Sequence, residues 1–573
     1  MSKDRRIVLP GRPMSRRTAI KLLGTGTLAL YLRPGLDVHA AASAKPAPGG
    51  TLADWSPIDR SLGDIAPPQF FGDEPEQAHK ILWDKPGYLA GLGGQLPKPG
   101  ERVKLAIIGG GMGGLFSAWL LRQHQPVLLE QAPRFGGNAK GQSWRGADYS
   151  IGAAYFIEPE ADSDIAKLAA ETGIDQLWKV SGGEAETFEL NGKLHEDFWS
   201  GNTAPEAKPQ FEKLAAYFNT IWEGETEPYP DIPIVDPEQE AYIKGLDQVS
   251  FAAHLQKIAG GKLHAQIETA IEHYCWSSFG GSMSEISAAA GLNFYTAELG
   301  NLIVLPGGNS AIAEQVLHKL SGALPAGHLR PGSLVYDVTV VEDGVLVSYA
   351  DRDGKPHILH AQSVVMACPK FVVAKILNGI EKERAAAIAR LSYRSYLVAN
   401  VLLKGDIGKS FYDLYLLGDG KTNLNKVQQS QLEQKATDVV LGTYAKPTPD
   451  VTVLTLYRGL PYDGARPELY APGVFPRYKQ VFEKQVVDSI LPLLGLQRSN
   501  VVDLRIARWG HPLPLAATGL IADGTVDRLR KPFRERVFFV EQDNWALPAF
   551  ETSVTEALTW SQPINKLLGG KSA

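Results

Sequence analysis

The chain has 573 residues, of which 44% are hydrophobic and 21% are charged, a balance typical of a globular protein with a large core. This length exceeds that of one ordinary domain, so we expect two domains. The formal net charge of −5 argues against a protein that binds nucleic acid. There are only two cysteines, Cys275 and Cys368, and no run of residues with metal-ligand spacing. The two cysteines could pair in an oxidising compartment, but the apolar strand around Cys368 favours a buried free thiol.

The first 44 residues have the pattern of an export signal. Ser15–Lys21 reads SRRTAIK, which resembles the twin-arginine consensus S-R-R-x-F-L-K with Ala19 in the phenylalanine position. Leu22–Leu32 is an apolar run too short to cross a bilayer, which takes about 20 residues. Ala40 and Ala44 are both candidates for the cleavage site. We therefore expect the twin-arginine translocase to export the folded protein to the periplasm.

Behind this segment lies the start of a nucleotide-binding pattern. Lys104–Ile108 is a short apolar run typical of a buried parallel strand, and it leads directly into GGGMGG. This segment fits G-x-G-x-x-G, with Gly109, Gly111 and Gly114 in the three glycine positions. The first glycine permits a tight turn, the second lets a pyrophosphate approach the backbone, and the third lets the next helix pack against the strand.

A helix, a second strand and an acid complete the pattern. Leu115–His124 carries apolar residues at helical spacing, and we expect Pro126 to end that helix. Val127–Leu129 predicts the second strand, and Glu130 follows about twenty residues after the first glycine. A carboxylate in this position accepts hydrogen bonds from the hydroxyls of an adenosine ribose. Strand, glycine turn, helix, strand and acid in this order predict a dinucleotide site.

The residues after Glu130 distinguish a flavin from a nicotinamide. Arg134–Asn138 resembles the E-x-x-x-R-x-G-G-R segment of the flavin-containing amine oxidoreductases, and Asp148–Tyr155 resembles their D-x-G-G-x-Y loop beside the isoalloxazine ring. This resemblance implies FAD. The family's last arginine is Asn138 here and a second is Ala132, so Arg134, Lys140 or the helix N-terminus must neutralise the phosphates. The residues that the pattern and the resemblance assign to FAD are Gly109, Gly111, Gly113, Gly114, Glu130, Gln131, Arg134, Gly136, Gly137, Asn138, Gly152, Ala153, Ala154, Val335, Asp543, Phe550, Thr552 and Ser553.

Later blocks extend the resemblance to the C-terminus. Asn301–Ser310 is similar to the family's P-G-G-N entry into a helix, and by resemblance Val335 brings its backbone to the adenine. Arg536–Asp543 and the helix after it are similar to the family's closing strand and flavin-covering helix, which implies that Asp543 binds a ribityl hydroxyl and that the helix N-terminus faces the flavin. Glu541 stands where the family has glycine, so the register of this block could be shifted by one.

These patterns together predict an α/β protein. A Rossmann-type FAD-binding domain of the glutathione-reductase kind is interleaved with a second, substrate-binding domain of mixed sheet and helices. The expected divisions are a signal at 1–44, an irregular arm rich in Pro, Gly and Asp at 45–100, the FAD-binding domain at 101–160, 300–375 and 507–573, and the substrate-binding domain at 161–299 and 376–506. Among the expected helices are Ser163–Thr172, Gln210–Trp222, Ile267–Tyr274, Ser284–Ala290 and Tyr478–Leu494.

The resemblance implies oxidation of an amine by hydride transfer to flavin N5, and it is nearest to bacterial spermidine-dehydrogenase-like proteins. The cofactor supplies this reactivity, so no catalytic triad is expected. Tyr155, Trp545 and Phe550 are candidates for the aromatic walls of the substrate pocket, and packing is the alternative role. His511 is a candidate pocket residue, with a structural role as the alternative. Glu158, Glu285 and Glu298 are the candidate carboxylates that would attract a polyamine into the cavity. Alternatively, each is a solvated charge on the surface.

The absence of a lysine from one stretch of the sequence bears on the electron acceptor. Oxidases of this family carry a lysine opposite flavin N5, whereas Ser395–Val401 contains none and offers only the neutral amide of Asn400. We therefore expect a dehydrogenase that passes electrons to a quinone or a cytochrome rather than to O2. Two other functions stay open: desaturation of a lipid or polyene substrate, with a long apolar tunnel, and a non-catalytic exported flavoprotein, with a blocked flavin face.

Overall fold

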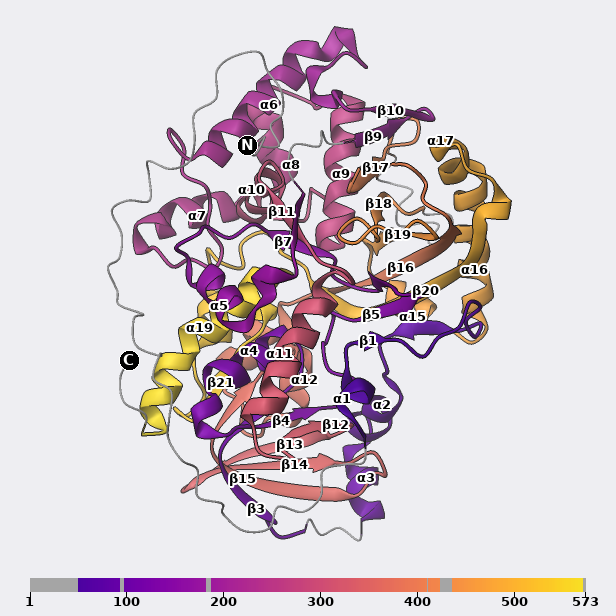
Figure 1. Ribbon diagram of the computed structural model, residues 1–573. Helices are drawn as coiled ribbons and strands as arrows, with labels where there is room; N and C mark the ends of the chain where they lie inside the picture. Colours follow the sequence, from indigo (N-terminus) through magenta and orange to yellow (C-terminus); the bar gives the residue numbers. More distant parts are fainter. Residues whose placement is uncertain (1–49, 93–96, 182–186, 410, 423–434, 570–573) are drawn as a thin grey trace.

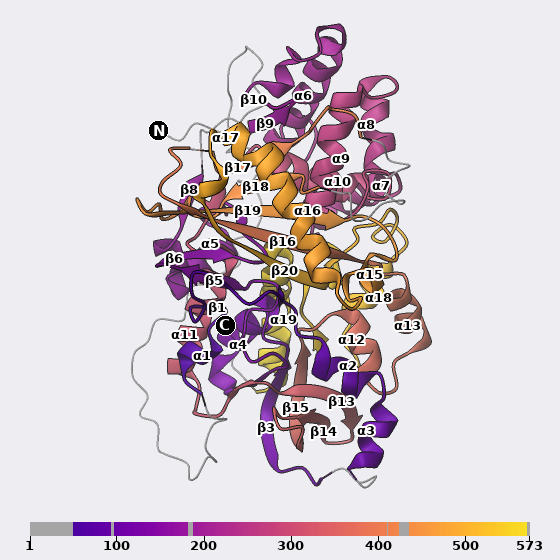
Figure 2. The same ribbon diagram turned by 90° about the vertical axis from the view of Figure 1, so that its right-hand side faces the viewer.

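Two large sheets and a layer of helices organise the chain (Figures 1 and 2). The computed structural model describes residues 50–92, 97–181, 187–409, 411–422 and 435–569. The expected export signal at 1–44 lies outside these residues. Within them the fold is mixed α/β, with a Rossmann-type domain interleaved with a second domain, as expected.

The first sheet holds the nucleotide-binding pattern. Its strands run in the order β12 (Leu329–Pro331), β4 (Val127–Glu130), β3 (Glu101–Ile108), β15 (Pro356–Met366), β14 (Gly344–Ala350) and β13 (Leu334–Val341), and β21 (Val537–Phe539) also pairs with β15. The pairs β12–β4, β4–β3, β3–β15 and β15–β21 are parallel. The C-terminal half of β3 is fully buried because helices cover the sheet, which explains its unbroken apolar sequence. The covering helices are α4 (Met112–Leu120), α11 (Asn309–Ala323) and α19 (Phe550–Leu567).

The second sheet belongs to the other domain. Its strands run in the order β10 (Lys193–His195), β9 (Thr187–Leu190), β17 (Asp413–Leu416), β18 (Asp438–Leu441), β19 (Val451–Leu460), β16 (Tyr393–Lys404), β20 (Val501–Pro514) and β2 (Phe70–Gly72). The long strands β16 and β19 pair antiparallel and are buried along nearly their whole length. The helical layer beside this sheet comprises α6 (Lys208–Glu223), α7 (Glu240–Asp247), α8 (Phe251–Ala259), α9 (Ala265–Phe279) and α10 (Ala288–Ala297).

Several expected elements begin or end elsewhere. The helix expected at 115–124 is α4 followed by a 3₁₀ turn at Arg122–His124, because Gln125 takes a left-handed conformation with φ of 50°. The helix expected at Ser284–Ala290 begins later, since the Ser287 hydroxyl caps α10 by accepting a hydrogen bond from the backbone N–H of Ala290. Residues 474–494 form α16 (Val474–Gln485), one π turn and α17 (Leu491–Leu494). The helix expected at 163–172 is α5 (Asp164–Thr172), capped by Ser163.

The segment expected to be an irregular arm contains regular structure instead. It carries α1 (Leu52–Trp55), β1 (Ile58–Asp59), β2, α2 (Glu76–Leu82) and α3 (Lys85–Gly91). β1 pairs parallel with β5 (Gly141–Trp144), and β2 pairs parallel with β20 at the edge of the second sheet. The arm therefore contacts both domains. The boundary expected at residue 507 falls inside β20, whose residues 501–514 all belong to one strand.

Candidate active site

The glycine turn after β3 has a geometry that only glycine permits at two positions. Gly109 has a φ of +109°, and a Cβ atom there would lie 2.2 Å from the carbonyl oxygen of Ala367. A Cβ atom on Gly114 would lie 1.8 Å from the carbonyl oxygen of Gly109. α4 begins directly after Gly111, and no side chain caps its first turn. The N–H groups of that turn are thus left to bind an anion such as a pyrophosphate.

Glu130, at the end of β4, is buried beside this turn. Its Oε2 accepts a hydrogen bond from the N–H of Gly110 at 2.7 Å, and its Oε1 accepts one from the N–H of Ala132 at 2.8 Å. Burial raises the pKa of Glu130, while these two N–H donors favour the ionised form. Each carboxylate oxygen keeps a further lone pair that can accept a hydroxyl hydrogen, as recognition of a ribose requires.

The two side chains expected to neutralise the phosphates, Arg134 and Lys140, lie in different surroundings. Arg134 donates to the carbonyl oxygen of Ser56 at 3.1 Å and to Asp59 Oδ1 at 3.1 Å, so it fastens the arm and does not line the cavity. Lys140 is buried, lines the cavity and has its Nζ 4.0 Å from Glu74 Oε1. Of the two cations offered by the sequence, Lys140 is the one that lines the cavity.

A single cavity of about 1160 Å³ runs through this region and into the second domain. Its volume exceeds the range of about 300–1,000 Å³ that is usual for small-ligand pockets, so it has room for more than one small molecule. Most of the residues assigned to FAD line it: Gly109, Gly111, Gly113, Glu130, Gln131, Gly136, Gly137, Asn138, Gly152, Ala153, Ala154, Val335, Asp543, Phe550 and Ser553. Gly114, Arg134 and Thr552 do not, since Gly114 packs against Gly109 and Thr552 is fully buried in α19.

The closing block contains a buried network that the sequence did not indicate. Asp543 Oδ2 accepts hydrogen bonds from the N–H of Lys370 at 2.8 Å and from the hydroxyl of Tyr393. The ammonium group of Lys370 donates to Glu541 and to Asn544. Burial and the neighbouring Asp543 raise the pKa of Glu541, and the charge and hydrogen bond of Lys370 oppose this rise. Glu541, found where the family has glycine, is therefore the counter-ion of a buried lysine.

The four residues expected to be catalytic fall into two groups. Tyr155 and His511 line the cavity: the Tyr155 hydroxyl donates to Glu298 at 2.8 Å, and the His511 ring stacks on Phe371 with centroids 4.3 Å apart. Burial lowers the pKa of His511 to about 3. Asn400 and Trp545 do not line it. Asn400 is fully buried in β16 and accepts a hydrogen bond from Thr455, and Trp545 donates to Glu556.

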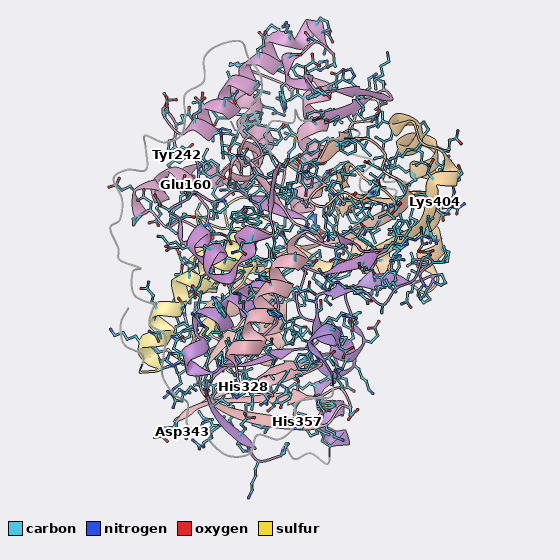
Figure 3. All side chains as sticks on the ribbon, in the orientation of Figure 1. Glu160, Tyr242, His328, Asp343, His357 and Lys404 are labelled. Carbon is cyan, nitrogen blue, oxygen red and sulfur yellow. The ribbon has the colours of Figure 1, made fainter. Side chains whose placement is uncertain are left out.

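Of the carboxylates considered from the sequence, two reach the cavity. Glu298 lies at its inner end, and Glu158 lines it while accepting a hydrogen bond from Asn301 at 2.6 Å. Glu285 forms an ion pair with Arg394 and does not line the cavity. Glu160, labelled in Figure 3, also belongs to the lining, whereas Lys404 at the end of β16 lies near the opposite edge of the molecule.

The inner end of the cavity carries polar residues that sequence reasoning missed. Asp438 on β18, Tyr396 on β16, Tyr457 on β19 and Ser277 on α9 all line it. The Tyr457 hydroxyl donates to the carbonyl oxygen of Gly152 at 2.9 Å, which joins this wall to the loop expected beside the flavin ring. An aspartate inside the apolar strand DVVL was the available signal, because a charge in a buried strand requires an explanation.

Comparisons with known proteins agree with this architecture. Residues 107–172 match the NAD(P)-binding Rossmann-like domain. The chain is 24% identical over 519 residues to oxidoreductase PigB of Serratia sp. (strain ATCC 39006), a match that covers 80% of this chain and 74% of that one.

Three solved structures illustrate the likeness of fold. Cyclohexylamine oxidase from Brevibacterium oxydans IH-35A is 18% identical with a TM-score of 0.60, over 82% of this chain and 99% of that chain. Putrescine oxidase bound to putrescine is 16% identical with a TM-score of 0.56, over 80% and 98%. A fatty acid isomerase from P. acnes that produces CLA is 15% identical with a TM-score of 0.56, over 81% and 98%.

The chain thus has a mixed α/β fold with a Rossmann-like domain, of the type found in the flavin amine oxidases. Proteins with this fold act on amines and on a fatty acid, so the fold alone does not choose the substrate. Within the described ranges no helix is long and apolar enough to cross a membrane, and no group of three potential ligands could hold a metal ion. Cys275 and Cys368 are both buried and free.

Proposed function

We propose that the protein is an FAD-dependent oxidoreductase that oxidises an amine. One observation carries this proposal: the cavity that begins at the glycine turn and Glu130 ends at buried carboxylates and tyrosine rings. The first end suits a dinucleotide, and the second suits a cationic or neutral amine, since carboxylates and aromatic faces both attract such groups. The likeness of fold to cyclohexylamine oxidase and putrescine oxidase supports the same substrate class.

The residues present fit FAD. The uncapped first turn of α4, with the glycines at 109 and 114, would hold the pyrophosphate. Glu130 would accept from the ribose hydroxyls, and Lys140 would supply positive charge. When bound, FAD supplies the two-electron oxidising power, accepting a hydride at its N5 atom. The chain would orient the substrate between Tyr155, Tyr396 and Tyr457, whose side chains line the cavity.

Two rival functions can be separated from this one. A desaturase of a lipid or polyene shares the cofactor site, and the similar fold of a fatty acid isomerase gives this alternative an observation of its own. The buried carboxylates at the inner end argue against an apolar chain there. A non-catalytic flavoprotein would have this space filled, whereas the cavity continues to Asp438.

Anaerobic mixing with a panel of substrates tests the proposal. Cyclic amines, diamines, polyamines, amino acids, fatty acids and polyenes are added in turn to the purified protein, and the flavin absorbance near its visible maximum is followed. We expect bleaching by at least one amine and none by the fatty acids or polyenes. Bleaching by a polyene alone would establish the desaturase, and no bleaching by any compound would favour the non-catalytic protein.

The finer points of the proposal concern substrate, acceptor and location. Spermidine-like polyamines are the first compounds to try, because of the sequence resemblance. We further propose a dehydrogenase whose electrons leave to a quinone or a cytochrome rather than to O2. The twin-arginine pattern supports export to the periplasm by the twin-arginine translocase. Cell fractionation followed by detection of the intact protein tests this, and recovery in the cytoplasm alone would contradict it.

A further inference from the structure

The inner wall of the cavity holds a chain of hydrogen bonds that ends at the carboxyl group of Asp438, with a second carboxyl group on the next strand. Ser277 Oγ donates to Asp438 Oδ2 at 3.0 Å and lies 3.1 Å from the Tyr396 hydroxyl, which itself donates to the carbonyl oxygen of Ser277 at 2.8 Å. The buried carboxyl group of Asp413, on the adjacent strand, is electrostatically coupled to Asp438. Ser277, Tyr396 and Asp438 all line the cavity. None of these groups is among the residues that we assign to the cofactor.

The two carboxyl groups are brought together by the sheet. β17 and β18 are antiparallel, with Asp413 opposite Val440 and Tyr415 opposite Asp438, so Asp413 and Asp438 are diagonal neighbours on one face. Both are buried. Two adjacent buried carboxylates repel each other as anions, so the pair favours holding one proton and a single negative charge. Such a pair can take up one more proton and release it again.

The position of the pair relates it to the reacting end of the cavity. The Tyr396 and Tyr457 rings contact each other with centroids 6.0 Å apart, and the Tyr457 hydroxyl is fixed to the carbonyl oxygen of Gly152. Tyr457, which is paired with Asp438 across β18 and β19, therefore lies between Asp438 and the loop at 152–154 that we assign to the flavin ring. A substrate amine that presents its carbon to the flavin would have its nitrogen on this side.

We propose that Asp438, paired with Asp413, is the proton acceptor for the substrate ammonium group, and that Ser277 and Tyr396 position it. This inference rests on the proposed function. In the step, an N–H bond of the ammonium breaks, the proton passes to the Asp438 carboxylate and the electron pair stays on nitrogen. The neutral amine can then lose a hydride from the neighbouring carbon to the bound FAD, which a protonated amine resists because its positive charge opposes hydride loss.

The titratable groups around Asp438 are Asp413 and Tyr415 on β17, Glu298 at the end of α10, Tyr396 on β16, Tyr457 on β19 and Tyr155 on β7 (Tyr155–Ile157). Burial and the neighbouring Glu298 raise the pKa of Asp438, which makes it a stronger base than an exposed aspartate. Burial raises the pKa of the tyrosines as well, so they remain hydrogen-bond donors.

The test is the rate of flavin reduction by an amine in a single anaerobic turnover, measured from pH 6.5 to 9.5. The holoprotein is compared with Asp438→Asn, Asp413→Asn and Ser277→Ala, and with Asp450→Asn as an exposed control outside the cavity. FAD content and melting temperature are measured for each, so that a variant that has lost its fold or cofactor is recognised. The amine is the one that gives the fastest bleaching of the unaltered protein.

We expect Asp438→Asn to keep its FAD but to be reduced at least tenfold more slowly at pH 7. Its rate should then rise about tenfold per pH unit, because the amine must lose its proton to water instead, and should approach the unaltered rate near pH 9.5. Ser277→Ala should show a smaller loss with the same recovery, and Asp450→Asn no change. Asp413→Asn leaves Asp438 without its partner and should shift the pH at which the rate begins to rise.

Two results would overturn the inference. If the loss in Asp438→Asn were as large at pH 9.5 as at pH 7, Asp438 would only bind the cation, since binding gains nothing from alkaline pH. An unchanged rate in Asp438→Asn would give it no role in the step. Failure of the proposed function looks different, because then no amine reduces the flavin of the unaltered protein at any pH.

Discussion

Single residues shape the cofactor end of the cavity at the glycine turn and at Glu130. Gly109 and Gly114 leave a signature because backbone conformation and close approach exclude every other residue. Asn400 was placed in the pocket from its strand alone, but Tyr396 and not Asn400 lines the cavity. Which stretch of a strand meets a cavity depends on the crossing of distant elements, and no local pattern records it.

Replacement of Glu130 by alanine tests the assignment of the dinucleotide site. The change leaves the N–H groups of Gly110 and Ala132 without their acceptor, at a cost of about 1–3 kcal/mol in unfolding free energy. It also removes the acceptor for the ribose, so FAD occupancy should fall together with melting temperature. Glu130→Gln keeps one acceptor oxygen, so its FAD occupancy and melting temperature should lie between those of Glu130→Ala and of the unaltered protein. Full FAD occupancy in Glu130→Ala would show that the turn binds something else.

His511 gives a prediction in pH. Its pKa falls from 6.5 to about 3 in the folded protein because it is buried against Phe371. The unfolded chain takes up a proton below pH 6.5 and the folded chain does not, so stability is full above pH 6.5 and is lost as the pH falls towards 3, by up to about 1.4 kcal/mol per unit. His511→Phe keeps the ring and lacks this loss. Unfolding of the two proteins by urea between pH 7 and 5 measures the difference, and parallel curves would contradict it.

At the scale of elements, the long helices and the β3–α4–β4 unit followed from periodicity and caps. The arm did not, because β1 and β2 have two and three residues and are strands only through their pairing with β5 and β20. Runs this short contain too few residues for an alternating pattern. β5 and β20 lie far along the chain from β1 and β2, so the sequence around β1 and β2 does not indicate that these residues pair as strands.

Asp73 joins the arm to the second sheet, so its replacement tests how much this attachment contributes to stability. Its carboxylate accepts hydrogen bonds from the N–H of Gly510 at 2.9 Å and from the Tyr470 hydroxyl, directly after β2. Asp73→Ala should lower the unfolding free energy by about 1–3 kcal/mol. Because residues 73–83 include part of the cavity wall, FAD should also dissociate faster. Asp353→Ala, at an exposed turn, is the matched control, and equal behaviour of the two variants would mean that the arm is only loosely attached.

The strand β16 leads to a prediction about oxygen. Its one lysine, Lys404, lies at its exposed far end near the edge of the molecule, and Lys370 is held by Glu541 and Asn544. Without a lysine from this strand to stabilise superoxide, we expect the reduced protein to react slowly with air and faster with a quinone. Stopped-flow mixing of the reduced protein with each acceptor gives the two rates. Reoxidation by air that keeps pace with turnover would make the protein an oxidase.

At the scale of the whole molecule, the account depends on one cavity shared by two domains. The Rossmann half supplies the glycine turn and Glu130, the second sheet supplies Tyr396, Tyr457 and Asp438, and the arm closes one side. The order of the blocks along the sequence predicted that two domains are interleaved. It could not predict that Asp438 of β18 lines the cavity beside Tyr396 of β16 and Tyr457 of β19, because that depends on how the two domains pack together.

The measurement that tests this account most directly is the cofactor content of the purified protein. We predict a yellow protein with the absorbance bands of a flavin, about one FAD per chain, and colour that passes into the supernatant on acid precipitation. Release is expected because the closing block around Asp543 contains no cysteine; Cys275 does not line the cavity, and Cys368, which does, is a buried free thiol. A colourless protein that takes up no FAD on reconstitution would contradict the assignment of the cavity, and colour retained in the pellet would contradict non-covalent binding.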